Sequence, residues 1–251
     1  MYIDAHAHLD QFKENIGTAL KIINGERILT LGCSMDIASY RFTKEISSSS
    51  EFIIPAFGIH PWKAAENLDM LGECDKLISE AACIGEIGLD FYWDTNKENY
   101  PAQYEVFEHM LDRCRLYGKV SNIHTKGAEN DVLRLLKSYN VISPIIHWYS
   151  GEIDILKKMI DLGCSFTVSV DAGISKATRE LIKLVPSELL LTETDGPNSL
   201  VWINGKYGYP DEVKNIVRSI AEIKNTEVEK MRDIINSNFI KKLNLFKERK
   251  E

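Results

Sequence analysis

The sequence predicts a (β/α)8 barrel, in which eight parallel strands close into a ring and each strand is followed by a helix. Three observations point to this fold class. Short apolar runs alternate with longer amphipathic stretches eight times along the chain. Several runs are apolar at consecutive positions, as at Ile53-Ile54 and Leu189-Leu190-Leu191, which suits strands buried on both faces. The length of 251 residues is that of a typical barrel, about 250 residues.

The predicted strands are short, and each stands before an amphipathic stretch. They cover residues 3–8, 27–32, 52–58, 83–87, 120–124, 144–147, 164–168 and 189–192. The helices between them cover 14–24, 36–49, 64–80, 98–117, 128–139, 152–161 and 175–185, and two more at 210–224 and 226–246 close the chain. Pro101 marks the start of one helix, and Gly163 marks the end of another.

An open doubly wound sheet uses the same alternation of strands and helices. No Gly-x-Gly-x-x-Gly follows any predicted strand, which removes the dinucleotide-binding form of that rival. We find no linker, composition break or internal repeat, so we expect a single domain over 1–251. The Lys/Glu/Arg-rich end, 247–251, is expected to be a solvated tail.

Composition narrows the class of protein. The net charge of −7 argues against a non-specific nucleic-acid binder, although it leaves room for an enzyme acting on nucleic acid. No apolar run reaches 18 residues and the first residues do not resemble a secretory signal, so we expect no membrane association. The five cysteines are scattered without a Cys-x-x-Cys pair, which predicts reduced thiols in a cytoplasmic protein. The sequence leaves the oligomeric state open, and a monomer is compatible with it.

Reactive side chains gather where the predicted strands end. Five of the six histidines stand there, and the sixth, His109, lies inside a helix and is expected to be structural. Side chains two residues apart share one face of a strand, so His6 and His8 can reach one metal ion together. Glu86 ends the fourth predicted strand, and Asp195 follows the eighth. The strand-end histidines are His6, His8, His60, His124 and His147.

The carboxyl ends of the strands of such a barrel form one rim, where its active sites lie. Taken singly, a strand-end histidine is more often structural, Glu86 could pair with a cation, and Asp195 could belong to an Asp-Gly turn. Taken together, the set favours a metal site. Nitrogen and oxygen donors suit Zn, Mn, Co, Ni or Fe better than calcium. Seven donors exceed one tetrahedral site, which predicts two divalent ions bridged by a carboxylate.

Six short segments, in order along the chain, resemble the successive motifs of the TatD family of metal-dependent deoxyribonucleases. Asn238-Phe239 with Leu245-Phe246 resembles the ending of that family. The six segments are His6-Ala7-His8-Leu9-Asp10, Gly58-Ile59-His60-Pro61, Gly85-Glu86-Ile87-Gly88-Leu89-Asp90, Ile123-His124-Thr125, His147-Trp148-Tyr149-Ser150-Gly151 and Glu193-Thr194-Asp195-Gly196-Pro197.

The resemblance implies a TIM barrel of the amidohydrolase-like superfamily, with a site for two divalent ions (Mg also among them) and DNase or 3′–5′ exonuclease activity. It implies a role for each strand-end residue. His6 and His8 would bind the first metal, Glu86 would bridge both, and His124 and His147 would bind the second. Asp195 would bind the first metal and contact the attacking water, and His60 would either support the ligands from behind or contact phosphate. We expect Asp195 to take a proton from that water as general base.

Two positions depart from the family pattern. Lys126 stands where the family often has arginine shortly after the fifth-strand histidine, and lysine cannot form the bidentate phosphate contact of arginine. Gly208 stands where the family has asparagine. Both positions concern substrate contacts, so they leave the natural substrate open.

All four tryptophans follow strands that bear site residues: Trp62, Trp93, Trp148 and Trp202. The same loops carry Lys63, Lys97, Lys126 and Lys206. Aromatic faces beside cations hold single-stranded nucleic acid, so we expect these tryptophans and Lys126 to bind a DNA substrate. An equally good interpretation is that the aromatic rings pack on each other and cap the barrel.

The sequence therefore favours hydrolysis of phosphodiester bonds, with Asp195, Glu86 and His60 as catalytic residues. The alternative is an amidohydrolase-like enzyme that cleaves a C–N, ester or lactone bond of a small molecule. Many such enzymes bridge their metals with a carboxylated lysine on the fourth strand, where this chain has Glu86 and no lysine. A non-catalytic protein is a third class, which the complete set of donors disfavours.

Overall fold

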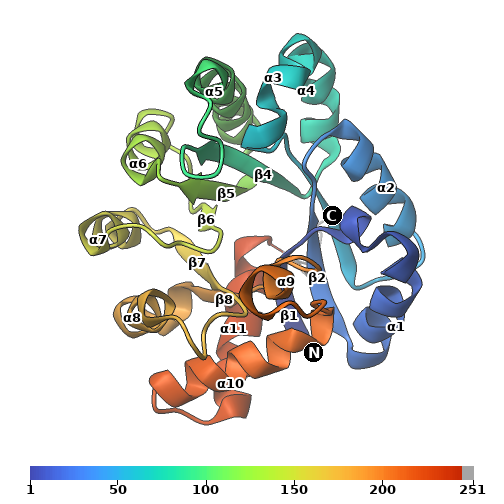
Figure 1. The fold of residues 1–251 in the computed structure, drawn as a ribbon, viewed down its shortest axis with the longest axis vertical. Helices are drawn as coiled ribbons and strands as arrows, with labels where there is room; N and C mark the ends of the chain where they lie inside the picture. Colours follow the sequence, from blue (N-terminus) through green and yellow to red (C-terminus); the bar gives the residue numbers. More distant parts are fainter. Residues whose placement is uncertain (245–251) are drawn as a thin grey trace, which may run out of the picture.

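The computed structural model describes residues 1–244. Eight parallel strands form one sheet in the order of the sequence, and the sheet curls into a barrel (Figure 1). The (β/α)8 fold class predicted from the sequence is confirmed. The strands are β1 (Tyr2–Ala7), β2 (Ile28–Cys33), β3 (Ile53–Phe57), β4 (Cys83–Asp90), β5 (Val120–Lys126), β6 (Ile145–Ile146), β7 (Ser165–Val168) and β8 (Leu190–Thr192).

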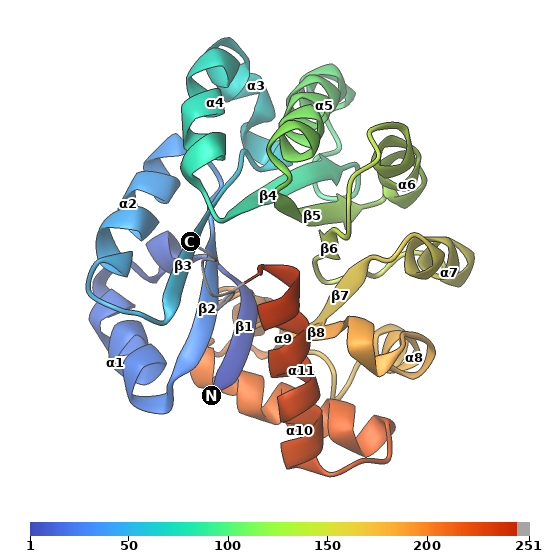
Figure 2. The ribbon, with the colours of Figure 1, turned by 180° about the vertical axis from the view of Figure 1, so that it is seen from behind.

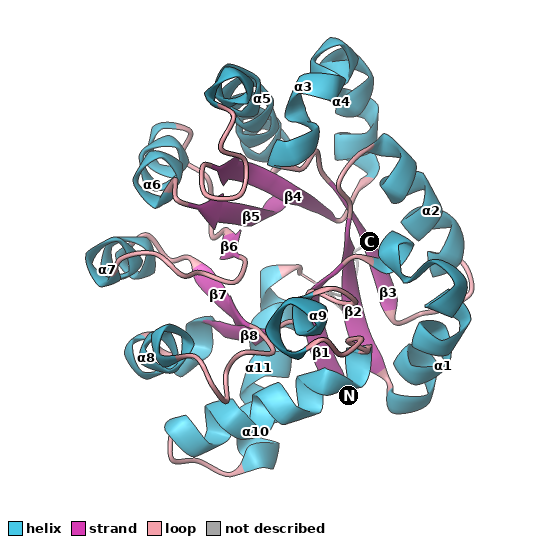
Figure 3. Cartoon of the chain, in the orientation of Figure 1, coloured by secondary structure: helices cyan, strands magenta, loops and turns pink. Residues whose placement is uncertain are grey.

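The helices surround the strands, as the view coloured by secondary structure (Figure 3) and the view from behind (Figure 2) show. They are α1 (Ile16–Glu26), α2 (Ile37–Ser47), α3 (Ala64–Asn67), α4 (Leu71–Glu80), α5 (Tyr100–Tyr117), α6 (Glu129–Ser138), α7 (Ile153–Asp161), α8 (Lys176–Leu184), α9 (Ser199–Asn204), α10 (Val213–Ile223) and α11 (Val228–Lys242). In the described chain, no helix combines the length and apolar character that crossing a membrane requires.

The strands are buried on both sides, by the barrel interior and by the helices. Every residue of β2 and of β4 is buried. Burial on both faces is the pattern expected of parallel strands, and it explains the apolar residues at consecutive positions. All five cysteines are free and buried, so they act as small core residues.

The barrel closes where β8 meets β1, and this closure positions site residues. The backbone N–H of Asp195 donates to the carbonyl of His6 at 2.9 Å, and the N–H of His8 donates to the carbonyl of Gly196 at 3.0 Å. Below them, the buried carboxylate of Asp4 accepts the N–H of Thr194 at 2.8 Å. These bonds bring together the first and the last of the segments that carry candidate ligands, from the two ends of the chain.

The structure corrects three sequence-based expectations about helices and strands. The predicted helix 64–80 is two helices, because Asn67 leaves the helical conformation at φ −119° and its side chain donates to the carbonyl of Lys63. β4 continues to Asp90, so Glu86 lies inside this strand rather than at its end. α9 was not predicted, since six residues are too few to show a helical period.

The helix predicted over 226–246 ends at Lys242, within the described residues. Two other sequence-based expectations fall outside the described residues, the Leu245-Phe246 pair and the tail 247–251.

Candidate metal centre

The seven predicted site residues meet at the carboxyl ends of the strands. All seven residues are buried, and none exposes more than 8% of its surface. His6 lies on β1 and His8 directly follows it, Glu86 lies on β4 and His124 on β5. His60, His147 and Asp195 follow β3, β6 and β8. The structure therefore brings together every residue of the predicted set.

Glu86 lies at the centre, and its two oxygens face different groups of histidines. On one side, Oε2 of Glu86 lies 3.3 Å from Nε2 of His6 and 3.2 Å from Nε2 of His8. Oδ1 of Asp195 lies 3.8 Å and 3.5 Å from the same two nitrogens. His6, His8 and Asp195 thus form one group whose donor atoms are close enough to hold a metal ion.

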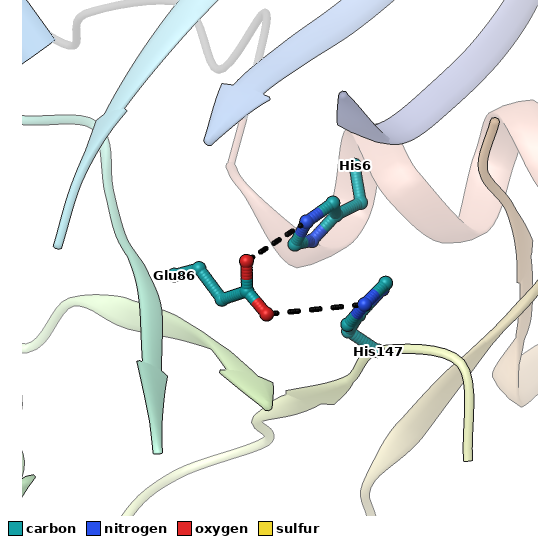
Figure 4. Close-up of side chains that lie close together, drawn as sticks. All are labelled: His6, Glu86 and His147. Carbon is teal, nitrogen blue, oxygen red and sulfur yellow. Dashed lines mark ion pairs between the residues drawn. The ribbon is translucent and has the colours of Figure 1, made fainter. Parts of the chain in front are cut away.

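The other oxygen of Glu86 faces the opposite side of the barrel. Oε1 of Glu86 lies 2.7 Å from Nδ1 of His124 and 3.8 Å from Nε2 of His147. Figure 4 shows the Glu86 carboxylate between the rings of His6 and His147, one oxygen directed at each. These two rings stack with their centroids 3.8 Å apart. One carboxylate therefore joins two groups of candidate ligands.

Three histidines are held so that a nitrogen lone pair points to this centre. Nδ1 of His8 lies 3.2 Å from the carbonyl oxygen of Cys33, which can only accept, so Nδ1 carries the proton. Nδ1 of His147 donates in the same way to the carboxylate of Glu193 at 2.8 Å. Nδ1 of His6 lies 2.9 Å from the amide oxygen of Asn122. Each Nε2 is then free to bind a metal, which is how partners behind metal ligands orient them.

His124 has the same arrangement with its nitrogens exchanged. Its Nε2 donates to Oδ2 of Asp90 at 3.0 Å, and its Nδ1 faces Glu86. Asp90 is fully buried and also accepts from the indole Nε1 of Trp62 at 2.8 Å. Burial opposes the ionisation of Asp90, but the hydrogen bonds from His124, the Trp93 amide and Trp62 outweigh it and lower the pKa to about 2. His124 therefore donates its hydrogen bond to an ionised carboxylate.

His60 differs from the other histidines of the site. Its Nδ1 accepts the backbone N–H of Trp62 at 3.1 Å, so the proton of the neutral ring sits on Nε2. Burial lowers the pKa of His60 to about 4, which keeps the ring neutral. Nε2 of His60 lies 3.5 Å from Oε1 of Glu86. His60 thus offers an N–H donor to the centre, where its four neighbours offer lone pairs.

The electrostatics of the centre fit a bound cation. Oε2 of Glu86 is buried and accepts no hydrogen bond, while lone pairs and carboxylate oxygens converge on it. Burial raises the pKa of Asp195, although the neighbouring histidines oppose this effect. Burial likewise opposes protonation of His8, but the adjacent Glu86 carboxylate raises its pKa. The protein groups therefore gather negative charge that a divalent ion would balance.

Glu86 reaches the centre because two strands approach closely. A Cβ atom at Gly58 would lie 2.5 Å from the carbonyl carbon of Gly85 and 2.6 Å from the nitrogen of Glu86. Only glycine leaves room for this approach, which explains the Gly58 of the segment Gly58-Ile59-His60-Pro61.

A cavity of about 950 Å³ opens above the metal centre. All four tryptophans line it, and Trp62, Trp93 and Trp202 expose 44%, 64% and 63% of their surface. Lys126 lines it as well, whereas Lys63 lines a separate hollow and pairs with Glu66 at 2.9 Å. Among the residues described, Lys126 is the only lysine or arginine lining the cavity. The tryptophans and Lys126 thus lie where the sequence placed them.

Three residues behind the ligands were missed by sequence reasoning: Asp90, Asn122 and Glu193. Asp90 and Glu193 lie inside segments already noted for Glu86 and Asp195. Asn122 lies two residues before His124 on the same strand, so the strand period could have pointed to it. The sequence does not show which histidine each of them contacts, because each histidine lies on or after another strand.

The barrel and its buried histidine–carboxylate centre define the class of this protein as a metal-dependent hydrolase. The model of the TatD related DNase family matches residues 3–244, so the chain belongs to this family. An uncharacterized metal-dependent hydrolase of Methanocaldococcus jannaschii is 27% identical over 246 residues, which are 96% of each chain. The uncharacterized metal-dependent hydrolase YabD of Bacillus subtilis is 29% identical over 254 residues, covering 95% of this chain and 97% of that one.

Solved structures share the fold. The TatD homologue YJJV of Escherichia coli superposes with a TM-score of 0.88 at 19% identity, covering 97% of this chain and 98% of that one. The phosphotriesterase homology protein of Escherichia coli, complexed with phosphate in its active site, superposes with a TM-score of 0.70 at 16% identity, covering 96% and 98%.

Proposed function

We propose that this protein is a two-metal phosphodiesterase that acts on DNA as a 3′–5′ exonuclease. The observation that carries the proposal is the position of Glu86, whose two oxygens face two separate groups of lone-pair donors. A carboxylate shared in this way suits two divalent ions about 3.5–4 Å apart, the arrangement of many enzymes that cleave phosphate esters.

The proposal divides the donors between two ions, which could be Zn, Mn, Co, Ni, Fe or Mg. His6, His8 and Asp195 would hold the first, His124 and His147 the second, and Glu86 both. Bound there, the ions would acidify a water molecule and withdraw charge from the phosphate oxygens.

Asp195 would act as the general base. Burial raises its pKa, so its carboxylate takes a proton more readily than an exposed aspartate. The N–H that His60 directs into the centre would donate to a phosphate oxygen. Lys126 would add a positive charge at the cavity wall, and the tryptophans would stack on bases.

A metal-exchange assay tests the activity. The purified protein is stripped of metal, reloaded with each divalent ion in turn, and given end-labelled single- and double-stranded DNA, RNA and a generic ester. We expect metal-dependent release of mononucleotides from DNA. Hydrolysis of the ester alone would contradict the proposed nuclease activity.

Asp195→Asn tests the general base. We expect turnover to fall at least about a hundredfold while some metal stays bound, since the amide cannot take the proton. Full activity with verified metal content would remove this role from Asp195. Alanine in place of Trp93 or Trp202 tests stacking, and unchanged affinity for single-stranded DNA would exclude it.

A second candidate is hydrolysis of a C–N, ester or lactone bond in a small molecule. The cavity favours it in one respect, since its lining offers Lys126 as the single lysine or arginine among the residues described. Against it, β4 has no lysine to carboxylate, and Glu86 occupies the central position. The generic ester in the assay above separates the two candidates.

A further inference from the structure

The wall of the cavity is aromatic on one sector of the barrel and acidic on another. The sector of β3 and β4 carries the exposed rings of Trp62, Tyr92 and Trp93. The sector of β5 to β7 carries three carboxylates, one after each strand. Glu129 begins α6, Glu152 directly precedes α7, and Asp171 lies between β7 and α8. The three helices lie side by side in both views (Figures 1 and 2).

These three acidic residues line the cavity. None of them forms an ion pair within the described residues. Glu129 accepts only a backbone N–H, from Gly127 at 3.2 Å, and Asp171 accepts the hydroxyl of Thr178 at 2.6 Å. The other oxygen of Asp171 is buried without a hydrogen-bond partner. Lys126, the last residue of β5, is the one lysine or arginine among the described residues of this wall, and the charges of Asp171 and Glu129 attract it. A phosphate placed beyond the reach of Lys126 would meet repulsion from the carboxylates.

Lys126 supplies positive charge at a single point. Its Nζ donates to the carbonyl of Trp148 at 2.5 Å and to Oγ of Ser150 at 3.1 Å. It also lies 5.4 Å from the centre of the Trp148 ring. An ammonium group has three N–H donors, so one remains for a substrate oxygen. The lysine is fixed in place and can serve one phosphate beside the metal centre.

We infer that the cavity accepts one phosphodiester group and disfavours a second, so that dinucleotides are better substrates than longer strands. This inference rests on the proposed phosphodiesterase function. One phosphodiester lies between the metal centre and Lys126, and the attached base stacks on the β3–β4 sector. Glu129, Glu152 and Asp171 repel the next phosphate. They are specificity-determining residues and take no part in the chemical step.

The test compares kcat/KM for a thymidine dinucleotide and an eight-nucleotide oligothymidylate. We expect the wild type to prefer the dinucleotide at low salt, with a smaller preference at about 0.5 M salt, where the charges are screened. Removing the charges in the variant Glu129→Gln/Glu152→Gln/Asp171→Asn should raise kcat/KM for the longer substrate roughly threefold per residue, with little change for the dinucleotide.

Two controls separate this effect from folding and from net charge. The variant Glu129→Gln/Glu152→Gln leaves Asp171 with its hydroxyl partner and should give about two thirds of the effect on a logarithmic scale. Glu188→Gln removes one exposed charge directly before β8, at the opposite end of the barrel. It should leave kcat/KM unchanged for both substrates. A wild type that prefers the longer strand at low salt, or a variant with unchanged preference, overturns the inference.

Binding provides a readout that needs no turnover. Every tryptophan of the chain lines the cavity, so intrinsic fluorescence reports on this site. In the presence of a chelator, the triple variant should bind the eight-nucleotide strand roughly tenfold or more tightly than the wild type at low salt. Equal affinities would reject the inference. Failure of the proposed function is recognised separately, as absence of hydrolysis of both substrates with every metal.

Discussion

Asp90→Asn tests how the histidines of the centre are held. Oδ2 of Asp90 accepts from His124 at 3.0 Å and from the Trp62 indole at 2.8 Å. Oδ1 accepts the backbone N–H groups of Tyr92 and Trp93 at 3.0 and 2.8 Å. An asparagine has one oxygen and one NH2 group, so whichever way it turns, two of the four donors face another donor.

These contacts give the expected loss of stability and of metal affinity in Asp90→Asn. A hydrogen bond to a charged group contributes about 1.5–3 kcal/mol, so two lost bonds should lower the free energy of unfolding by about 3–6 kcal/mol. His124 also loses a negatively charged partner, and loss of such a partner behind a ligand lowers metal affinity about 10–100-fold. The lower stability and the lower metal affinity both follow from loss of the Asp90 carboxylate.

Urea unfolding of the metal-free proteins measures the first effect, and titration with a divalent ion against a competing chelator measures the second. Asp69→Asn is the matched control, because Asp69 is exposed on the short helical turn between α3 and α4. If Asp90→Asn unfolds within about 1 kcal/mol of the wild type and binds metal equally well, the account of this carboxylate is wrong.

Three further changes test other parts of the structure. Gly58→Ala forces a Cβ against β4, so it should displace Glu86 and reduce bound metal, measured after dialysis. Asn238→Ala removes the donor to two carbonyls at the start of β8, at 2.8 and 2.9 Å, and should cost about 2 kcal/mol in urea unfolding. Burial lowers the pKa of Lys242 to about 8 from 10.5, so the unfolded chain holds this proton more tightly. Stability relative to Lys242→Met should therefore rise by up to about 3 kcal/mol between pH 7 and 10, with the exposed Lys241→Met as control, and a flat difference would refute it.

The positions of the candidate ligands could be predicted from the sequence because parallel strands place their carboxyl ends on one rim. His6, His124 and Asp195 each stand at such an end, so the topology alone brings them together. The helix at 64–80 was predicted wrongly for a local reason, since the side chain of Asn67 competes with the backbone for hydrogen bonds.

Roles that depend on a partner from another strand could not be predicted in this way. The orientation of His124 depends on Asp90 of β4, and the orientation of His147 depends on Glu193. The sequence suggested that several lysines surround the substrate, but Lys63 pairs with Glu66 beside a separate hollow.

The sequence by itself determined the barrel, the rim and the set of donors that meet there, because strand period and chain order decide these features. Only the tertiary structure decided which nitrogen of each histidine faces the centre, and that one wall of the cavity is acidic and another aromatic. Those properties depend on contacts between strands and on which loops share one cavity, and such contacts exist only once the barrel has closed.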